Sequence, residues 1–496
     1  MKISILMMMN KIKHDMKVPE CLKRANITIL HKKNCKLDLN NWRGVFVCSE
    51  LRNILMKLIH DRTYELVSSS MTGAQIGARR KMSVRNHIFI LNSILSDVLS
   101  SKKKNSIDLN ILNFKQMFDC EELNSVLNSF YDAGVKDDMF CLKNEANKDV
   151  TFVVKTPTGL TDQKTMRNKI MQGDVLSPLM SSNFVDKNIG KVALSTGNVY
   201  MYKNKVIIPP LMMQDDTCKV DVWEEAVIKP DGIVHIEDNY LGEEAMKKVQ
   251  SKKYFGDIIS QDMKNTLNIK EKNNKAVGIV KKISTCLYER PYGRHTFRAA
   301  KLLREGLLLG SMLNNCESWV NITKCDLDNL EKPDTMVQRS ILTNYGNPSK
   351  VFMSLELGVI PVKFVIMEKR LNFLKYILGE NISSMIRQVY EALKGDSRKG
   401  DFVSLIKTDM EELSIEITEE EIVSLKKTDW KKYVNEIIKG TAFVTLVNEN
   451  KEKSRTKHIH FEKFEMSKYL VKNKNTSLSK IINRPGVAGA VLQTAS

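Results

Sequence analysis

The residues best suited to chemistry in this chain are two adjacent aspartates, Asp215 and Asp216. Apolar residues 211–213 lead into the pair and residues 218–222 alternate after it, a pattern that predicts a β-hairpin with both carboxylates at its tip. Two neighbouring negative charges repel each other unless a cation binds them, and hard divalent cations prefer carboxylate oxygens. The pair therefore predicts a metal site, with a solvated acidic turn as the alternative interpretation.

The elements that must position this hairpin can be read from periodicity. Residues 107–114 alternate as a strand, and residues 121–133 carry an apolar stripe at helical spacing that ends at Gly134. A helix is expected to begin near Val175, with Pro178 in its first turn. Residues 199–208 read as a strand, a turn and a strand.

From about residue 268 the pattern becomes almost wholly helical. Residues 297–313 and 362–378 predict strong helices, and Thr418-Glu-Glu-Glu421 is a capping box. Pro333 is expected to interrupt a further helix that lies between these two. A mixed first half and a helical second half together indicate an α+β protein.

Composition restricts the class of partner. The chain has 496 residues, of which 42% are hydrophobic and 27% charged, and its formal net charge is +19. Such an excess favours a polyanionic partner, nucleic acid or an acidic membrane surface, although a merely lysine-rich surface is the alternative. No apolar run is long enough for a membrane helix, and residues 3–9 do not resemble a signal peptide.

The cysteines indicate a reducing environment. Nine are scattered along the chain without any Cys-x-x-Cys pair, so neither a disulfide framework nor a zinc site is expected. We therefore expect an intracellular protein of the cytoplasm or nucleus.

Three segments give the acidic pair a more specific meaning. They are Ile111-Leu-Asn-Phe-Lys-Gln-Met-Phe-Asp119, Met171-Gln-Gly-Asp-Val-Leu-Ser-Pro-Leu179 and Met213-Gln-Asp-Asp216. In this order they resemble the polymerase motifs of reverse transcriptases, specifically those of non-LTR retrotransposons. The second segment is the most specific, because Gln-Gly-x-x-Leu-Ser-Pro is rarely met by chance.

Further segments extend the resemblance over roughly residues 18–470. They are residues 29–33 and 41–44, residues 75–79 with Ser83, residues 253–257, residues 355–361 and residues 369–374. The resemblance implies a right-hand polymerase fold with fingers, a palm built on a small antiparallel sheet, and a helical thumb. The implied boundaries are 1–106 for the fingers, 107–262 for the palm, 263–348 for the thumb, 349–470 for a helical C-terminal region and 471–496 for a frayed tail.

The resemblance also implies an activity, RNA-directed DNA polymerisation, with an RNA template, a DNA primer and deoxynucleoside triphosphates as partners. Mg²⁺, with Mn²⁺ as a substitute, would be held at the positions of Asp215, Asp216 and Asn113, where two-metal chemistry takes place. The other implied roles are nucleotide binding by Lys32, Arg43, Arg79, Phe118, Gln172 and Gly173, and a primer grip at Tyr254 and Gly256. Solvated surface bases and a core aromatic are the alternatives for Lys32, Arg43, Arg79 and Phe118.

Asn113 is the main departure from the family, because it stands where the family has a metal-binding aspartate. An amide oxygen can ligate a hard cation but brings no negative charge, so polymerisation is expected to be impaired. Met213-Gln214 replaces a Tyr-Ala pair, Met171 replaces a proline, and only 38 positions separate Asp216 from Tyr254. With no endonuclease or zinc-knuckle region recognised, the alternative is an inactive retroelement relic that keeps the fold and binds RNA.

Overall fold

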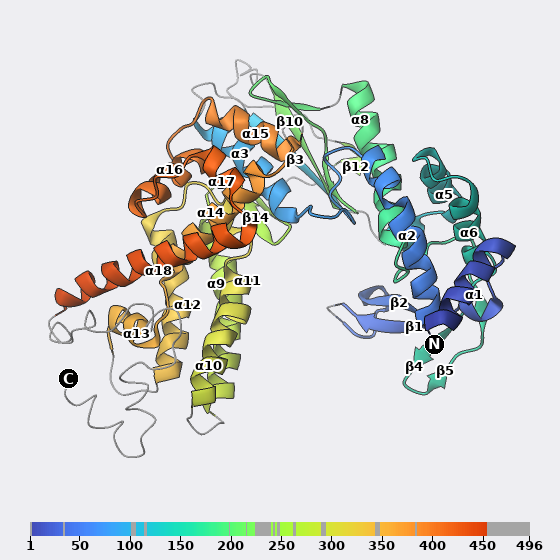
Figure 1. The fold of residues 1–496 in the computed structure, drawn as a ribbon, viewed down its shortest axis with the longest axis horizontal. Helices are drawn as coiled ribbons and strands as arrows, with labels where there is room; N and C mark the ends of the chain where they lie inside the picture. The colour runs from blue at the N-terminus through green and yellow to red at the C-terminus, as the bar shows by residue number, and fades with distance from the viewer. Residues whose placement is uncertain are drawn as a thin grey trace. The chain divides into compact units, whose positions relative to one another are not determined.

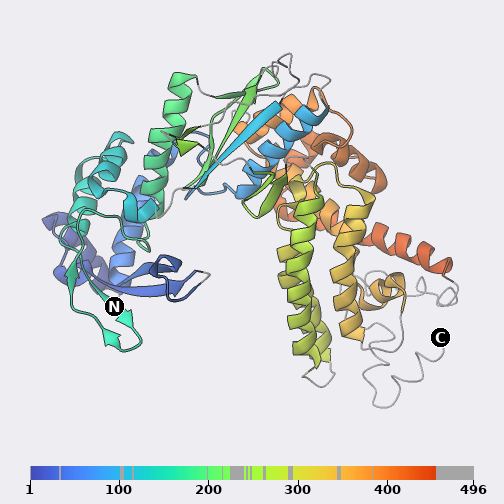
Figure 2. The same ribbon diagram turned by 180° about the vertical axis from the view of Figure 1, so that it is seen from behind.

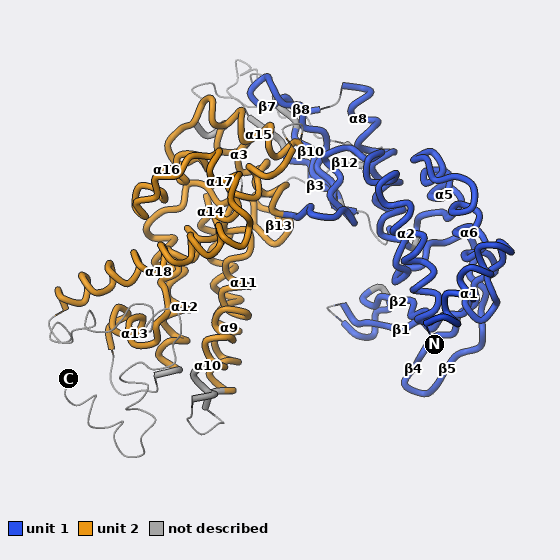
Figure 3. Tube along the Cα trace, in the orientation of Figure 1, with its two compact units in different colours: residues 1–84, 105–226 blue, residues 85–104, 227–496 orange. Residues whose placement is uncertain are grey.

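The computed structural model shows a mixed fold in which helices accompany several small sheets (Figure 1). The described residues are 2–32, 35–100, 106–113, 117–197, 199–214, 216–223, 240–241, 244–245, 249–260, 264–288, 294–342, 348–381 and 384–453. They belong to two compact units, residues 1–84 with 105–226 and residues 85–104 with 227–496 (Figure 3). The predicted α+β class is confirmed, while the division into fingers, palm and thumb stays a prediction and the predicted frayed tail lies outside the described residues.

The described part of the first unit contains three sheets, one of them the short hairpin β7–β8, and the helices around them. In chain order its elements are α1 (Lys2–Asp15), η1 (Glu20–Lys23), β1 (Arg24–His31), η2 (Leu39–Asn41), β2 (Trp42–Cys48), α2 (Glu50–Ser70), β3 (Ser106–Asn113), α4 (Met117–Cys120), α5 (Leu123–Asp132), α6 (Asp137–Asn147), β4 (Thr151–Thr156), β5 (Gly159–Leu160), β6 (Lys164–Thr165), α7 (Ser177–Val185), η3 (Asp186–Gly190), α8 (Lys191–Thr196), β7 (Tyr200–Tyr202), β8 (Val206–Ile208), β9 (Leu211–Met213) and β10 (Asp216–Trp223). One sheet has the order β2-β1-β4-β5, with β6 also on β4 and with β1 parallel to β4. Another is the antiparallel sheet β3-β10-β9, whose two long strands lie side by side (Figure 2).

The core of this unit joins α1, α2, α5, α6 and α7. The stripe predicted in residues 121–133 is buried there at Leu123, Val126, Leu127 and Phe130. The prediction that Tyr131 also points inward is wrong, because its side chain is exposed. Gly134 follows α5 with a φ of +96°, the left-handed conformation expected just after a helix. The helix α7, which begins at the end of the Gln-Gly segment, packs against α2 and α5.

The second unit is mainly helical. Its elements are α3 (Val84–Ser100), β11 (Tyr240–Leu241), β12 (Glu244–Ala245), β13 (Ser251–Tyr254), β14 (Asp257–Ser260), α9 (Thr266–Tyr288), α10 (Arg294–Leu303), η4 (Arg304–Leu309), α11 (Gly310–Met312), η5 (Cys316–Ser318), α12 (Lys324–Leu342), α13 (Lys350–Leu357), α14 (Val362–Leu378), α15 (Met385–Lys394), α16 (Phe402–Glu412), α17 (Glu419–Ser424) and α18 (Lys427–Lys451). The bounds predicted for α14 are confirmed, and so is the capping box of α17 at Thr418 and Glu421. Edge-to-face rings of Phe89, Phe373 and Phe402 join α3, α14 and α16.

The prediction that Pro333 interrupts a helix is wrong, because α12 continues through it. Proline has no N–H and leaves the carbonyl four residues earlier, that of Asn329, without its helical partner. The Asn273 side chain of α9 supplies the missing donor, with Nδ2 at 3.0 Å from the Asn329 oxygen. The long pairing of α9 with α12 thus makes the proline tolerable (Figure 1).

Candidate functional site

The acidic hairpin forms as the alternation predicts. β9 and β10 pair through Met213 and Asp216, so the turn lies between these two residues. On its other edge β10 pairs with β3, and the partner of Asp216 there is Asn113. Two segments separated by about a hundred positions in the sequence are therefore neighbours at one end of this sheet. Asp215 and the side chain of Asn113 lie outside the described residues.

Burial of this sheet decreases toward the end that carries Asp216. Thr217 and its partner on β9, Met212, are almost completely buried. The next pair, Asp216 and Met213, is half-buried, and successive strand residues point to opposite faces. Cys218 and Leu211, the pair on the same face as Asp216 and Met213, are also fully buried, so the partial exposure of Asp216 comes from its position at the end of the sheet.

The Gln172–Gly173 segment packs against the middle of β2. The N–H of Phe46 donates to the carbonyl oxygen of Gln172 at 2.8 Å. Gly173 has a φ of +119°, and a Cβ placed on it would lie 2.3 Å from the Phe46 carbonyl oxygen. Only glycine satisfies both conditions, so its occurrence here has a direct steric reason.

A buried cluster of charges under this segment was not predicted. The Asp174 carboxylate lies 3.3 Å from Arg52 of α2 and 3.3 Å from Lys143 of α6. Burial alone would raise the pKa of Asp174, but the two cations outweigh it and the pKa lies below its usual value. Burial also disfavours the charged form of Lys143, and the pKa of this amine lies below its usual value. One feature of the sequence indicated a buried charge, because Arg52 lies on the same stripe of α2 as the apolar Leu55.

The predicted phosphate-binding bases differ in how far their side chains are engaged. Lys32 and Arg43 are exposed, and the pairing of Leu30 with Arg43 places both bases on the same face of the β1–β2 ladder. The guanidinium of Arg79 instead donates to the carbonyl oxygens of Thr72 at 2.8 Å and of residue 75 at 3.1 Å. Burial lowers the pKa of Arg79. Its described contacts are those of a residue that braces the backbone.

Phe118 and the predicted primer grip have well-defined surroundings. Phe118, on α4, is half-buried and packs against the core cluster of its unit. In the other unit, Tyr254 and Asp257 close the hairpin β13–β14 around Phe255 and Gly256, with φ values of +48° and +90°. Two positive φ values are typical of the tight turns that join antiparallel strands. Asp257 anchors this hairpin through an ion pair to Lys272 of α9 at 2.7 Å.

The donor types of Asn113, Asp215 and Asp216, one amide and two carboxylates, suit a hard cation. Carboxylate and amide oxygens are ligands that Mg²⁺ accepts. Within the described ranges, however, no three His, Cys, Asp or Glu side chains gather in a group that could hold a metal ion. All nine cysteines are free thiols. No helix in the described part of the chain is long and apolar enough to cross a membrane.

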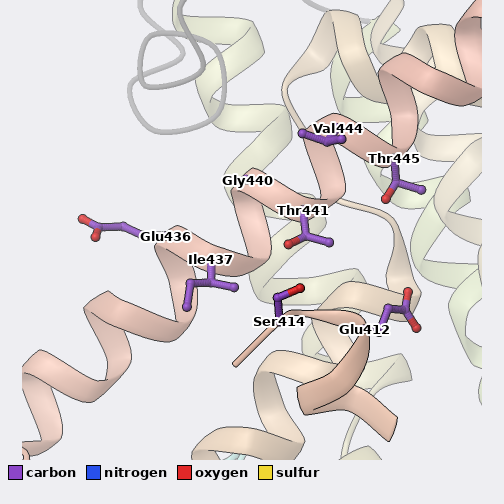
Figure 4. A pocket seen from close by; sticks show the side chains of 8 residues that line it. All are labelled: Glu412, Ser414, Glu436, Ile437, Gly440, Thr441, Val444 and Thr445. Atoms are coloured by element: carbon purple, nitrogen blue, oxygen red, sulfur yellow. The ribbon is translucent and has the colours of Figure 1, made fainter. Parts of the chain in front are cut away.

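The second unit also carries an open groove of about 560 Å³ between the end of α16 and α18 (Figure 4). Small and apolar side chains of α18 form one wall, and carboxylates stand at its rim. The lining residues are Glu412, Ser414, Glu436, Ile437, Gly440, Thr441, Val444 and Thr445. None of the predicted site residues is among them.

No protein-family model matches the sequence, and no curated protein matches it. Solved structures that match include apo telomerase from Candida tropicalis, at 12% identity and a TM-score of 0.37, covering 83% of this chain and 69% of that one. Telomerase from Candida albicans, in complex with the TWJ fragment of telomeric RNA, matches at 11% identity and a TM-score of 0.39, over 84% and 66%.

A third match is apo telomerase from Candida tropicalis truncated from the C-terminal domain. It shares 12% identity at a TM-score of 0.31, over 41% of this chain and 44% of that one. The chain thus spans under half to about two thirds of the length of these neighbours.

Proposed function

We propose that this chain is a reverse-transcriptase domain protein of the non-LTR retrotransposon type, with impaired RNA-directed DNA polymerisation. The observation that carries the proposal is the strand pairing of Asn113 with Asp216. Two segments singled out independently for their polymerase-like residues are adjacent in the fold. A chance resemblance would not require these segments to meet at one end of one sheet.

The neighbouring residues support the same role. Gly173 brings the backbone of the Gln-Gly segment against β2, the strand that carries Arg43, and Lys32 follows directly on the adjacent strand β1. Exposed bases on a strand ladder suit the phosphates of an incoming nucleotide. In this proposal Asp215, Asp216 and Asn113 would hold Mg²⁺, which when bound activates the attacking hydroxyl and stabilises the leaving pyrophosphate.

The amide of Asn113 is the reason to expect weak activity. One anionic ligand fewer in a site that binds divalent cations removes charge stabilisation of about 3–4 kcal/mol, by analogy with the loss of one preorganised electrostatic group. Since each 1.4 kcal/mol is about tenfold in rate, polymerisation is expected to run about 10²–10³-fold slower than with an aspartate.

Primer extension on an RNA template tests the proposal. We expect the wild-type chain to extend slowly with Mg²⁺ and faster with Mn²⁺, and Asn113→Asp to raise the rate by about 10²-fold. Asp216→Asn, made in the Asn113→Asp background, is the matched control and should abolish the gain. A folded Asn113→Asp protein that extends no primer with either cation contradicts the proposal.

A second function is favoured by the same amide. A chain that has lost its first acidic ligand, keeps exposed bases such as Lys32 and Arg43, and has a net charge of +19 could bind RNA without catalysis. Fluorescence anisotropy with a single-stranded RNA at several salt concentrations distinguishes the two functions. Steeply salt-dependent binding together with an inert Asn113→Asp variant favours the binding role, and no measurable binding at low salt excludes it.

A further inference from the structure

The turn of the acidic hairpin has a strained residue at its start. Gln214 follows Met213 with a φ of +55°, a conformation that few residues other than glycine adopt without support. The next residue along the chain is Asp215, the first of the two acids. A contact that holds the backbone of Gln214 therefore also restricts the backbone that leads into the acidic pair.

The support comes from residues 74–77, which run alongside β9. The N–H of Ile76 donates to the carbonyl oxygen of Met212 at 2.9 Å, and the N–H of Met212 donates to that of Ala74 at 2.9 Å. Between them Gln75 pairs with Met212 in a parallel bridge, and its side chain is completely buried. The segment thus acts as one more short strand beside the hairpin.

The side-chain oxygen of Gln75 is positioned at the turn itself. Oε1 accepts the N–H of Gly77 at 2.8 Å and the N–H of Gln214 at 3.2 Å. Gly77 lets the backbone approach, because a Cβ on it would lie 2.7 Å from the Gln214 nitrogen and 2.7 Å from Ser182 Oγ. One buried oxygen therefore ties the strained residue to a segment packed directly against it.

The strand register places the side chain of Gln75 on the face of the sheet opposite to that of Asp216. Gln75, Met212 and Thr217 are cross-strand partners in one row, and all are buried. Asp216 belongs to the adjacent row, whose side chains point to the other face of the sheet. Gln75 can thus act on the carboxylate of Asp216 only through the backbone of the turn.

We propose that Gln75 is a positioning residue that fixes the turn of the acidic hairpin, a role that rests on the function proposed above. Its Oε1 holds Gln214, the residue that precedes the acidic pair in the sequence, in the left-handed conformation. Gly77 keeps the holding segment within reach. Loss of the acceptor should loosen the turn and displace the carboxylates without unfolding the unit.

Amide hydrogen exchange of the full chain tests the holding role without reference to catalysis. Gln75→Met keeps the volume but removes the acceptor, and we expect exchange at residues 213–216 to rise by about tenfold or more. Gln75→Glu, measured below about pH 5 where a buried carboxyl stays protonated, retains an acceptor oxygen and should keep most of the protection. Thr63→Val is the control, since it removes another buried side-chain hydrogen bond of the same unit, from Thr63 Oγ1 to the Ile59 carbonyl oxygen at 2.9 Å, and should leave the turn protected.

Primer extension in the Asn113→Asp background tests the consequence for catalysis. Gln75→Met should lower kcat by about 10–100-fold, as losses of supporting residues around metal sites do, with little change in KM for the nucleotide. Unchanged exchange at residues 213–216 in Gln75→Met, or equal loss of protection in Gln75→Glu or Thr63→Val, overturns the proposal. If exchange rises as expected but Asn113→Asp is inert, the holding role stands and the polymerase function fails.

Discussion

Gly173 lies so close to Phe46 that a Cβ on residue 173 would stand 2.3 Å from the Phe46 carbonyl oxygen. The same two segments are joined by the hydrogen bond from Phe46 N–H to the Gln172 carbonyl oxygen at 2.8 Å. The Gln-Gly segment and β2 are therefore in direct backbone contact. Any side chain at position 173 must separate them.

Gly173→Ala is expected to destabilise the first unit by about 2–4 kcal/mol, since strained φ and steric overlap both contribute. Gly159→Ala is the matched control, because Gly159 also has a positive φ, +135°, but nothing within 4 Å of a Cβ there. Urea unfolding of both variants measures the difference, which isolates the contact with Phe46. Equal destabilisation of the two variants would show that the contact with β2 contributes nothing.

The buried cluster of Asp174, Arg52 and Lys143 predicts a second stability effect. Asp174→Asn leaves two buried cations without their anion and should lower the free energy of unfolding by about 3–5 kcal/mol at pH 7. Asp162→Asn, at an exposed position of the same unit, should change it by less than about 0.5 kcal/mol. Chemical denaturation followed by circular dichroism measures both.

The pH dependence of this cluster has a definite sign. The pKa of Asp174 is lower in the folded chain than its ordinary value, because Lys143 and Arg52 outweigh the effect of burial. The unfolded chain therefore binds this proton first, so the contribution is fully present above about pH 3.9 and is lost as pH falls through the folded pKa. The difference in stability between wild type and Asp174→Asn should shrink in acid, and a constant difference would contradict the ionised state of Asp174.

Glu356 of α13 predicts the opposite trend. Burial raises the pKa of this carboxyl from 4.5 to about 8. The folded chain then holds a proton that the unfolded chain releases, so the associated stability is present below pH 4.5 and is lost as pH rises to about 8. Glu356→Gln should be more stable than wild type at pH 8 and similar to it at pH 4.5, as measured by unfolding at both values. A variant that gains nothing at pH 8 would show that the carboxyl is ionised in the fold.

The tolerance of α12 for Pro333 predicts a coupling between two helices. Asn273→Ala should destabilise the second unit by about 1–2 kcal/mol, because the Asn329 carbonyl oxygen loses its donor. In a Pro333→Ala background the helix supplies its own N–H to that oxygen, and the same substitution should matter less. A double-mutant cycle by urea unfolding measures the coupling, and strict additivity would show that Asn273 does not compensate for the proline.

Features with local signals could be predicted from the sequence, and contacts between distant segments could not. The alternation around Asp215 and Asp216 predicts the β9–β10 hairpin, and Pro361 with the stripe after it predicts α14. The pairing of Arg52 with Asp174 joins positions 122 apart, and no pattern within α2 names the partner of a buried arginine. The continuity of α12 through Pro333 was not predicted for the same reason, because the compensating donor, Asn273, lies on another helix.

The same distinction applies to the residues of the candidate site. Its glycine, its acids and its exposed bases are recognisable as residue types in sequence motifs. Gln75 also stands in one of these segments, residues 75–79, but its contact with the turn does not follow from the sequence, because its partner Gln214 lies 139 positions further along the chain. The role of Arg79 also needed the fold, since only the positions of the Thr72 and Gln75 carbonyl oxygens show that its guanidinium is engaged.

The exposed bases in β2 and directly after β1 predict an effect on nucleotide binding. Arg43 and Lys32 lie on one face of the β1–β2 ladder and are the described candidates for binding a triphosphate. Charge-assisted hydrogen bonds to phosphate contribute about 1.5–3 kcal/mol, so Arg43→Ala in the Asn113→Asp background should raise KM for the nucleotide about 10–100-fold. Arg62→Ala, at an exposed position of α2, is the matched control for lost charge. Steady-state extension kinetics measure KM for both variants. Equal increases in KM would mean that Arg43 acts only through the overall charge. The triphosphate would then have to bind elsewhere.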